Sequence, residues 1–138
     1  MRHFVPSTFS GSLRDELDGF MIAGKNMRGA AVSKKAAEFS SALDACKKIW
    51  KEVAFQRHTG EAWRSQFLAG MYDAEMLAVN ELTPVELNRA IAKSSEAVKQ
   101  TSQLFKNKAF ENSVRQGTNT PSFVRNRVNS VLEMLRAL

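Results

Sequence analysis

The feature that most constrains the fold of this chain is an apolar repeat of helical spacing within residues 33–57. Its members, separated by four, three, four and three residues, are Phe39, Leu43, Cys46, Trp50 and Val53. These intervals place side chains on one face of an α-helix, because an α-helix has 3.6 residues per turn. We therefore predict a helix from Ser33 to about Arg57 with one buried face.

Two further helices have recognisable starts. The segment Thr83-Pro84-Val85-Glu86 combines a capping threonine, a proline at the first helical position and a glutamate two residues later. Thr120-Pro121 repeats the first two of these features. The sequence therefore predicts helices over residues 83–105 and 121–138.

The apolar stripes of these two helices differ in width. Residues 121–138 carry the helical repeat Val124, Val128, Val131, Leu135 and Leu138. Residues 83–105 carry the narrower stripe Leu87, Ile91, Val98 and Phe105, with small polar residues between its members. We expect the helix over 83–105 to lie on the surface and to contribute little to the core.

The remaining segments complete an all-α prediction. Ser12 can cap a short helix that ends near Gly24, and residues 24–31 have the composition of a hinge loop. A wide apolar stripe predicts the most buried helix over residues 61–80. Because no period-two alternation or hairpin signal is present, we expect a compact bundle of about five helices.

The length of 138 residues fits one domain. Residues 1–11 lack periodicity and predict an extended N-terminal arm, which leaves residues 12–138 as the bundle domain. Cys46 is the only cysteine, so no disulfide can form within the chain, which is typical of a reducing compartment. With no membrane span or signal segment recognised in the sequence, we expect a cytoplasmic protein with no membrane partner.

The residues that commonly carry catalysis do not form a recognisable site. His3 and His58 are far apart, and Cys46 falls in an apolar repeat, where we expect it to be buried. Asp73 and Glu75 are two residues apart, so they point to different helix faces, and we expect them to be solvated or paired with Arg64. We therefore expect a protein that is not an enzyme and that has no cofactor and no metal.

Positive charge is concentrated in two blocks of the sequence. The net charge is +6, with eight basic and three acidic residues in 25–58 and nine basic and three acidic residues in 87–138. Residues 59–86 between them hold one basic and five acidic residues. Such blocks favour encounters with polyanions, although a solvated basic surface that only keeps a protein soluble has the same composition.

The basic blocks give the first hypothesis of function, a nucleic-acid contact surface or a helical subunit of a nucleoprotein complex. Lysine and arginine bind the phosphate backbone without reading the bases, so DNA and RNA are not distinguished. The residues that we expect to contact phosphate are Lys25, Arg28, Lys34, Lys35, Lys47, Lys51, Arg89, Lys93, Arg125 and Arg127.

The alternative hypothesis is a protein–protein interaction module, namely an inhibitor, adaptor or assembly subunit without nucleic-acid contact. Phe4, Val5 and Phe9 lie in the polar N-terminal arm, where they need a partner or the chain's own bundle to cover them. The narrow stripe of residues 83–105 is a second candidate surface for a partner helix. An interaction module should expose an apolar patch, whereas a nucleic-acid binder should join its basic blocks on one surface.

Overall fold

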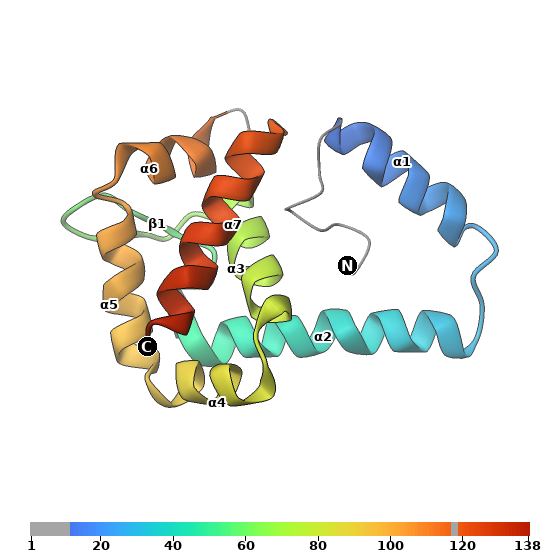
Figure 1. Cartoon of the computed structure of the whole chain (residues 1–138), viewed down its shortest axis with the longest axis horizontal. Helices are drawn as coiled ribbons and strands as arrows, with labels where there is room; N and C mark the ends of the chain where they lie inside the picture. The colour runs from blue at the N-terminus through green and yellow to red at the C-terminus, as the bar shows by residue number, and fades with distance from the viewer. Residues whose placement is uncertain (1–11, 117–118) are drawn as a thin grey trace.

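The computed structural model describes residues 12–116 and 119–138, so the expected N-terminal arm and its Phe4, Val5 and Phe9 lie outside the described residues. The described part is mostly helical, as the all-α prediction requires (Figure 1). Its α-helices are α1 (Leu13–Gly24), α2 (Ala30–Trp50), α3 (Ala69–Glu81), α4 (Pro84–Ala92), α5 (Ser94–Leu104), α6 (Lys108–Arg115) and α7 (Pro121–Arg136). A short 3-10 helix, η1 (Lys51–Val53), and two strands, β1 (Arg57–His58) and β2 (Trp63–Arg64), complete the described elements. The expected number of five helices is wrong, since the described residues form seven.

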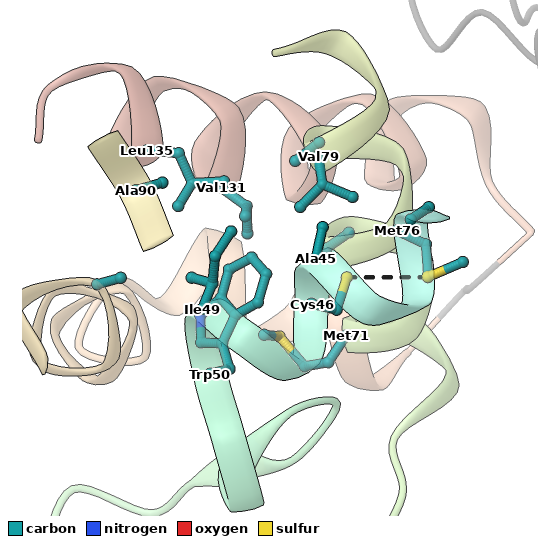
Figure 2. Packing of buried hydrophobic residues seen from close by; sticks show 14 of the residues in the cluster. Ala45, Cys46, Ile49, Trp50, Met71, Met76, Val79, Ala90, Val131 and Leu135 are labelled. Carbon is teal, nitrogen blue, oxygen red and sulfur yellow. Dashed lines mark hydrogen bonds between the residues drawn. The ribbon is translucent and has the colours of Figure 1, made fainter. Parts of the chain in front are cut away.

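The compact part of the molecule is built around α3 and α7, which pack side by side (Figure 1). The C-terminal half of α2 and helices α4, α5 and α6 surround this pair. Figure 2 shows side chains from α2, α3, α4 and α7 meeting in the core, with the Cys46 thiol 3.8 Å from the Met76 sulfur. Four members of the predicted stripe of α7, Val124, Val128, Val131 and Leu135, are buried, whereas the fifth, Leu138, is half-buried and lies beyond the end of the helix.

Residues 12–41 extend away from this compact part (Figure 1). They comprise α1, the linker 25–29 and the first half of α2, and we call them the helical projection; the rest of the described chain is the body. None of the described side chains in the projection is buried. Phe39, which the apolar repeat assigns to a buried face, is 43% exposed. Burial along α2 begins only at Ala42, where the helix enters the body.

The middle of the chain corrects two predicted helices. α2 ends at Trp50 because Lys51 has a φ of 52°, outside the helical region. Residues 57–64 form an antiparallel hairpin in which His58 pairs with Trp63, and Gly60 turns the chain with a φ of 99°. Helix α3 therefore starts at Ala69, eight residues later than the predicted start of the helix over 61–80.

The predicted surface helix over residues 83–105 is two helices that meet at Lys93 and pack against α2. Small polar residues of α5, read from the sequence as surface positions, are buried at this contact. The Ser94 hydroxyl donates to the Ile49 carbonyl at 2.8 Å, and the Trp50 indole N–H donates to the Thr101 hydroxyl at 2.8 Å. These hydrogen bonds satisfy buried polar groups and let α2 and α5 approach closely.

The predicted starts of α1, α4 and α7 are confirmed. The Glu86 N–H donates to the Thr83 hydroxyl, and the Thr83 N–H donates back to the Glu86 carboxylate at 2.7 Å, which completes a capping box. The Asp15 N–H donates to the Ser12 hydroxyl at the start of α1. α7 begins at Pro121, as the proline predicts.

Candidate functional site

The candidate site with the strongest charge is the basic segment, which we define as residues 25–51. It contains seven lysines or arginines and only two acids, Glu38 and Asp44. Six of the seven cations are exposed, and none of the six makes an ion pair within the described residues. They are Lys25, Arg28, Lys34, Lys47, Lys48 and Lys51.

Helix α2 sets the spacing of these cations. Its 21 residues span roughly 32 Å, with Lys34 near one end and Lys47 and Lys48 in the last turn. The buried face of α2 in the body is formed by Ala42, Ala45, Cys46, Ile49 and Trp50. Because the lysines lie outside this face, the body holds the helix while the cations remain in solvent.

Lys35 differs from the other cations of the basic segment. It is half-buried, and its Nζ lies 5.2 Å from the centre of the Phe20 ring of α1. This cation–π contact joins α1 to α2 and engages the ammonium group within the chain. Lys35 is therefore less available for a phosphate than Lys34.

The expected cations of the second basic block are largely engaged within the body. The Arg89 guanidinium donates to the carbonyl of Arg136 at 2.8 Å, and the Lys93 ammonium donates to the backbone oxygen of Leu138. Both contacts hold α4 against the end of α7. Arg125 is half-buried and has interactions of its own within the chain. Arg89, Lys93 and Arg125 are thus not free cations.

Arg127 corrects the sequence-based set of phosphate contacts. Its side chain is 0% exposed, its Nη2 lies 2.7 Å from a carboxylate oxygen of Asp73, and its Nη1 donates to the Ser113 carbonyl at 3.0 Å. The expectation that Asp73 is solvated or paired with Arg64 is therefore also wrong. Burial raises the pKa of Asp73, and the Arg127 guanidinium opposes that rise. Arg127 joins α3, α6 and α7 and has no surface with which to touch a phosphate.

Glu75 is a buried acid, although the sequence predicts that it is solvated or forms an ion pair. The side chain is fully buried on α3, and its Oε2 accepts the N–H of Phe55 at 3.0 Å, while Oε1 has no hydrogen-bond partner. Burial raises the pKa of Glu75 well above its usual value, and the Phe55 N–H opposes the rise. Its neighbours one helical turn away, Met71, Ala78 and Val79, are all apolar, which is a sequence signal that could have revealed this burial.

The expected burial of Cys46 is confirmed. Burial raises the pKa of the Cys46 thiol, and the nearby Glu75 carboxyl raises it further. Because the thiolate is the reactive form of cysteine, this environment opposes nucleophilic chemistry at Cys46.

The described residues contain no cluster of three or more histidine, cysteine or acidic side chains placed to hold a metal ion. Among the helices of the described part, none combines the length and the apolar composition that a bilayer span requires. Comparisons with family models, with curated proteins and with solved structures found no match to this chain.

Proposed function

We propose that this protein acts by binding and does no chemistry, and that the basic segment binds the phosphate backbone of a nucleic acid. The observation that carries this proposal is the set of six exposed cations on α2 and its flanks, none of which is neutralised by an acid within the described residues. An extended row of such cations suits a polyanion, because each phosphate contact releases condensed counterions.

The structure refines the set of residues proposed to contact phosphate. The central members are Lys25, Arg28, Lys34, Lys47 and Lys51, all exposed. Lys35, Arg89, Lys93 and Arg125 are secondary because each has a partner within the chain. Arg127 is left out because it is buried. Lysine is the main cation of the central set, which favours backbone contact over base recognition.

The test is fluorescence anisotropy of labelled single- and double-stranded DNA and RNA at about 50 and about 200 mM salt, since phosphate binding weakens steeply over that range. We expect micromolar or tighter binding that salt weakens. The double variant Lys34→Glu, Lys47→Glu should weaken binding and lower the salt slope by about two units. The matched control is Lys106→Glu, Lys108→Glu, which makes the same charge change at exposed positions outside the basic segment.

Two results would count against the proposal. Binding to none of the four nucleic acids would exclude an autonomous nucleic-acid activity. Equal weakening by the basic-segment variant and by its control would mean that net charge, rather than the basic segment, determines binding.

A second candidate function is a protein-interaction module, and the helical projection favours it. Within the described residues the projection has no buried side chain, yet it carries large apolar residues with substantial exposure: Leu17, Phe20, Met21, Ile22, Val32 and Phe39. Contiguous apolar surface of this kind is typical of an interaction site. The stripe of residues 83–105, the other candidate surface, is used within the body, because α4 and α5 pack against α2.

A further inference from the structure

We propose that the helical projection is a self-association surface, on which a second copy of this chain docks by twofold symmetry. This inference rests on the second candidate function, that the projection binds a protein, and it names the partner. The proposed surface shares residues 25–35 with the basic segment, so Lys25, Arg28 and Lys34 cannot face α1 of a second copy and bind phosphate at the same time.

Helix α1 needs a partner in order to be stable. It has 12 residues, and isolated helices shorter than about 12–15 residues are marginal in water. Gly19 weakens it further, and none of the described side chains of α1 is buried. Its contact with α2 includes the cation–π pair of Lys35 with Phe20. A partner can supply the packing that α1 does not gain from the described residues.

A hollow in the projection gives the partner a place to bind. It has a volume of about 410 Å³ and lies between α1 and the first half of α2, the two helices that face one another across the linker in Figure 1. Its apolar lining includes Phe20, Met21, Val32 and Phe39. We call these four residues the apolar patch. Each of them is substantially exposed, so all four gain burial when a partner covers the hollow.

The charges on the two sides of the apolar patch are opposite. On the α1 side, residues 12–24 contain three acids, Asp15, Glu16 and Asp18, and one base, Arg14. On the other side, residues 25–35 contain four bases and no acid. Arg14 lies 3.8 Å from Asp18, and no ion pair in the described structure joins the acids of α1 to the cations of residues 25–35. Asp15, Glu16 and Lys35 line one hollow of the chain without an ion pair between them, so these opposite charges can also act between molecules.

A second copy satisfies both sides of this pattern at once. A twofold axis through the apolar patch exchanges its two sides, so the acidic helix α1 of each copy faces residues 25–35 of the other. A uniformly acidic partner would be repelled by α1, and a uniformly basic partner would be repelled by residues 25–35. The charge pattern thus favours a partner that carries the same two segments as this chain.

The first test is the mass of the purified protein in solution, measured by sedimentation velocity from about 1 to about 200 µM, a range that resolves micromolar dissociation constants. We expect the mass to rise from the 15.4 kDa of one chain to twice that value. Met21→Glu should raise the dissociation constant at least about tenfold, because it places a carboxylate in an apolar contact. The matched control is Val85→Glu on α4, since Val85 is 75% exposed and Met21 is 69% exposed.

The second test uses two variants with opposite charge changes. Asp15→Lys, Asp18→Lys makes both sides of the patch basic, and Arg28→Glu, Lys34→Glu makes both sides acidic or neutral; Lys35 and its contact with Phe20 are left intact. Each variant should dimerise more weakly than the wild type. An equimolar mixture should form heterodimers, detected by native mass spectrometry, because the acidic α1 of one variant then faces the basic residues 25–35 of the other, and the second contact, basic against neutral, is not repulsive.

Three results would overturn the proposal: one-chain mass at every concentration, equal effects of Met21→Glu and Val85→Glu, or no heterodimer in the mixture. A fluorescent dye that binds apolar surfaces distinguishes a projection that does not self-associate from a projection that is not an interaction surface at all. If the monomer binds the dye and Met21→Glu removes that binding, the projection is an open apolar surface whose partner is not a second copy. If Met21→Glu leaves dye binding unchanged, the interaction function at the projection fails too.

Discussion

Glu75 stabilises an unusual stretch of backbone between α2 and the hairpin. Lys51 and Phe55 both have positive φ values, 52° and 63°, which residues other than glycine rarely adopt. The Glu75 carboxyl accepts the N–H of Phe55 at 3.0 Å and so fixes the second of these residues. The ring of Phe55 lies against Tyr72, one turn before Glu75 on α3. A single buried acid therefore ties the connection after α2 to the central helix of the body.

The environment of Glu75 makes the stability of the fold depend on pH. Because burial raises the pKa of Glu75 in the folded protein above its usual value of 4.5, the folded state favours the protonated carboxyl. The stability that protonated Glu75 contributes is therefore fully present below the usual pKa of 4.5. It is lost as the pH rises through the raised pKa of the folded protein. Glu75→Gln, which stays neutral, should therefore gain stability over the wild type above about pH 4.5, by up to about 1.4 kcal/mol per pH unit.

Urea unfolding of both proteins from pH 4 to pH 8 measures this difference, with the pH range chosen to bracket the onset of the effect. Glu81→Gln is the matched control, because it removes an exposed carboxyl from the same helix. A difference between Glu75→Gln and wild type that stays constant with pH would show that Glu75 keeps the same charge in the folded and unfolded states.

Helices α3 and α6 are in close backbone contact, and Gly70 permits it. A Cβ atom built at Gly70 would lie 2.3 Å from the carbonyl oxygen of Val114 and 2.7 Å from its Cα. These are backbone atoms, so the clash can be relieved only by moving one helix away from the other. No such neighbour exists at Gly19 of α1, where a Cβ atom would meet nothing within 4 Å.

Substitution of these two glycines by alanine should therefore have opposite effects. Gly70→Ala should destabilise the protein by about 1–3 kcal/mol, because the strain exceeds the gain in helix propensity. Gly19→Ala, the control, should stabilise helix α1 by up to about 1 kcal/mol and leave the stability of the body unchanged. Thermal and urea unfolding followed by circular dichroism compare the two. A Gly70→Ala protein as stable as the wild type would mean that α3 and α6 can separate at no cost.

Local signals in the sequence predicted those elements whose causes are local. The threonine-proline pairs predicted the starts of α4 and α7, although only Thr83 accepts a capping hydrogen bond, and the repeat of valine and leucine predicted the buried face of α7. These features depend on residues within one or two turns of each other. The exposed cations at the start and end of α2 were likewise predictable, because they lie off its apolar repeat.

Contacts between distant segments account for what the sequence did not predict. The small polar residues Ser94 and Thr101 indicated a surface helix, yet their partners are on α2, at Ile49 and Trp50. Arg127 was grouped with the phosphate contacts because its partner, Asp73, is 54 residues away in the chain. A single sequence does not reveal such pairs, and they decide whether a polar side chain belongs to the surface or to the core.

The whole molecule divides into a packed body and a projection without buried side chains among its described residues. The basic segment runs through both, from the linker of the projection to the end of α2 in the body (Figure 1). In a dimer formed through the projection, residues 25–35 face α1 of the other copy, and one particle carries two sets of the exposed cations Lys47, Lys48 and Lys51. Self-association would then strengthen phosphate binding through a second set of contacts on the same nucleic acid, without any change in the single chain.

Hydrogen exchange should reveal this division and its dependence on concentration. In the monomer, amides of α1 should exchange fast, because local opening of this helix exposes almost no buried surface, whereas amides of α3 and α7 should exchange through global unfolding. Raising the concentration from about 1 to about 100 µM should slow exchange in α1 and in the first half of α2 and leave α3 and α7 unchanged, since mass action then populates the dimer. Mass spectrometry of peptic fragments measures all four segments in one experiment.

Met21→Glu should abolish the concentration dependence and Val85→Glu should retain it. If α1 is as protected as α7 at the lowest concentration, residues within the same chain already cover the projection, and a second copy has no surface left on which to bind.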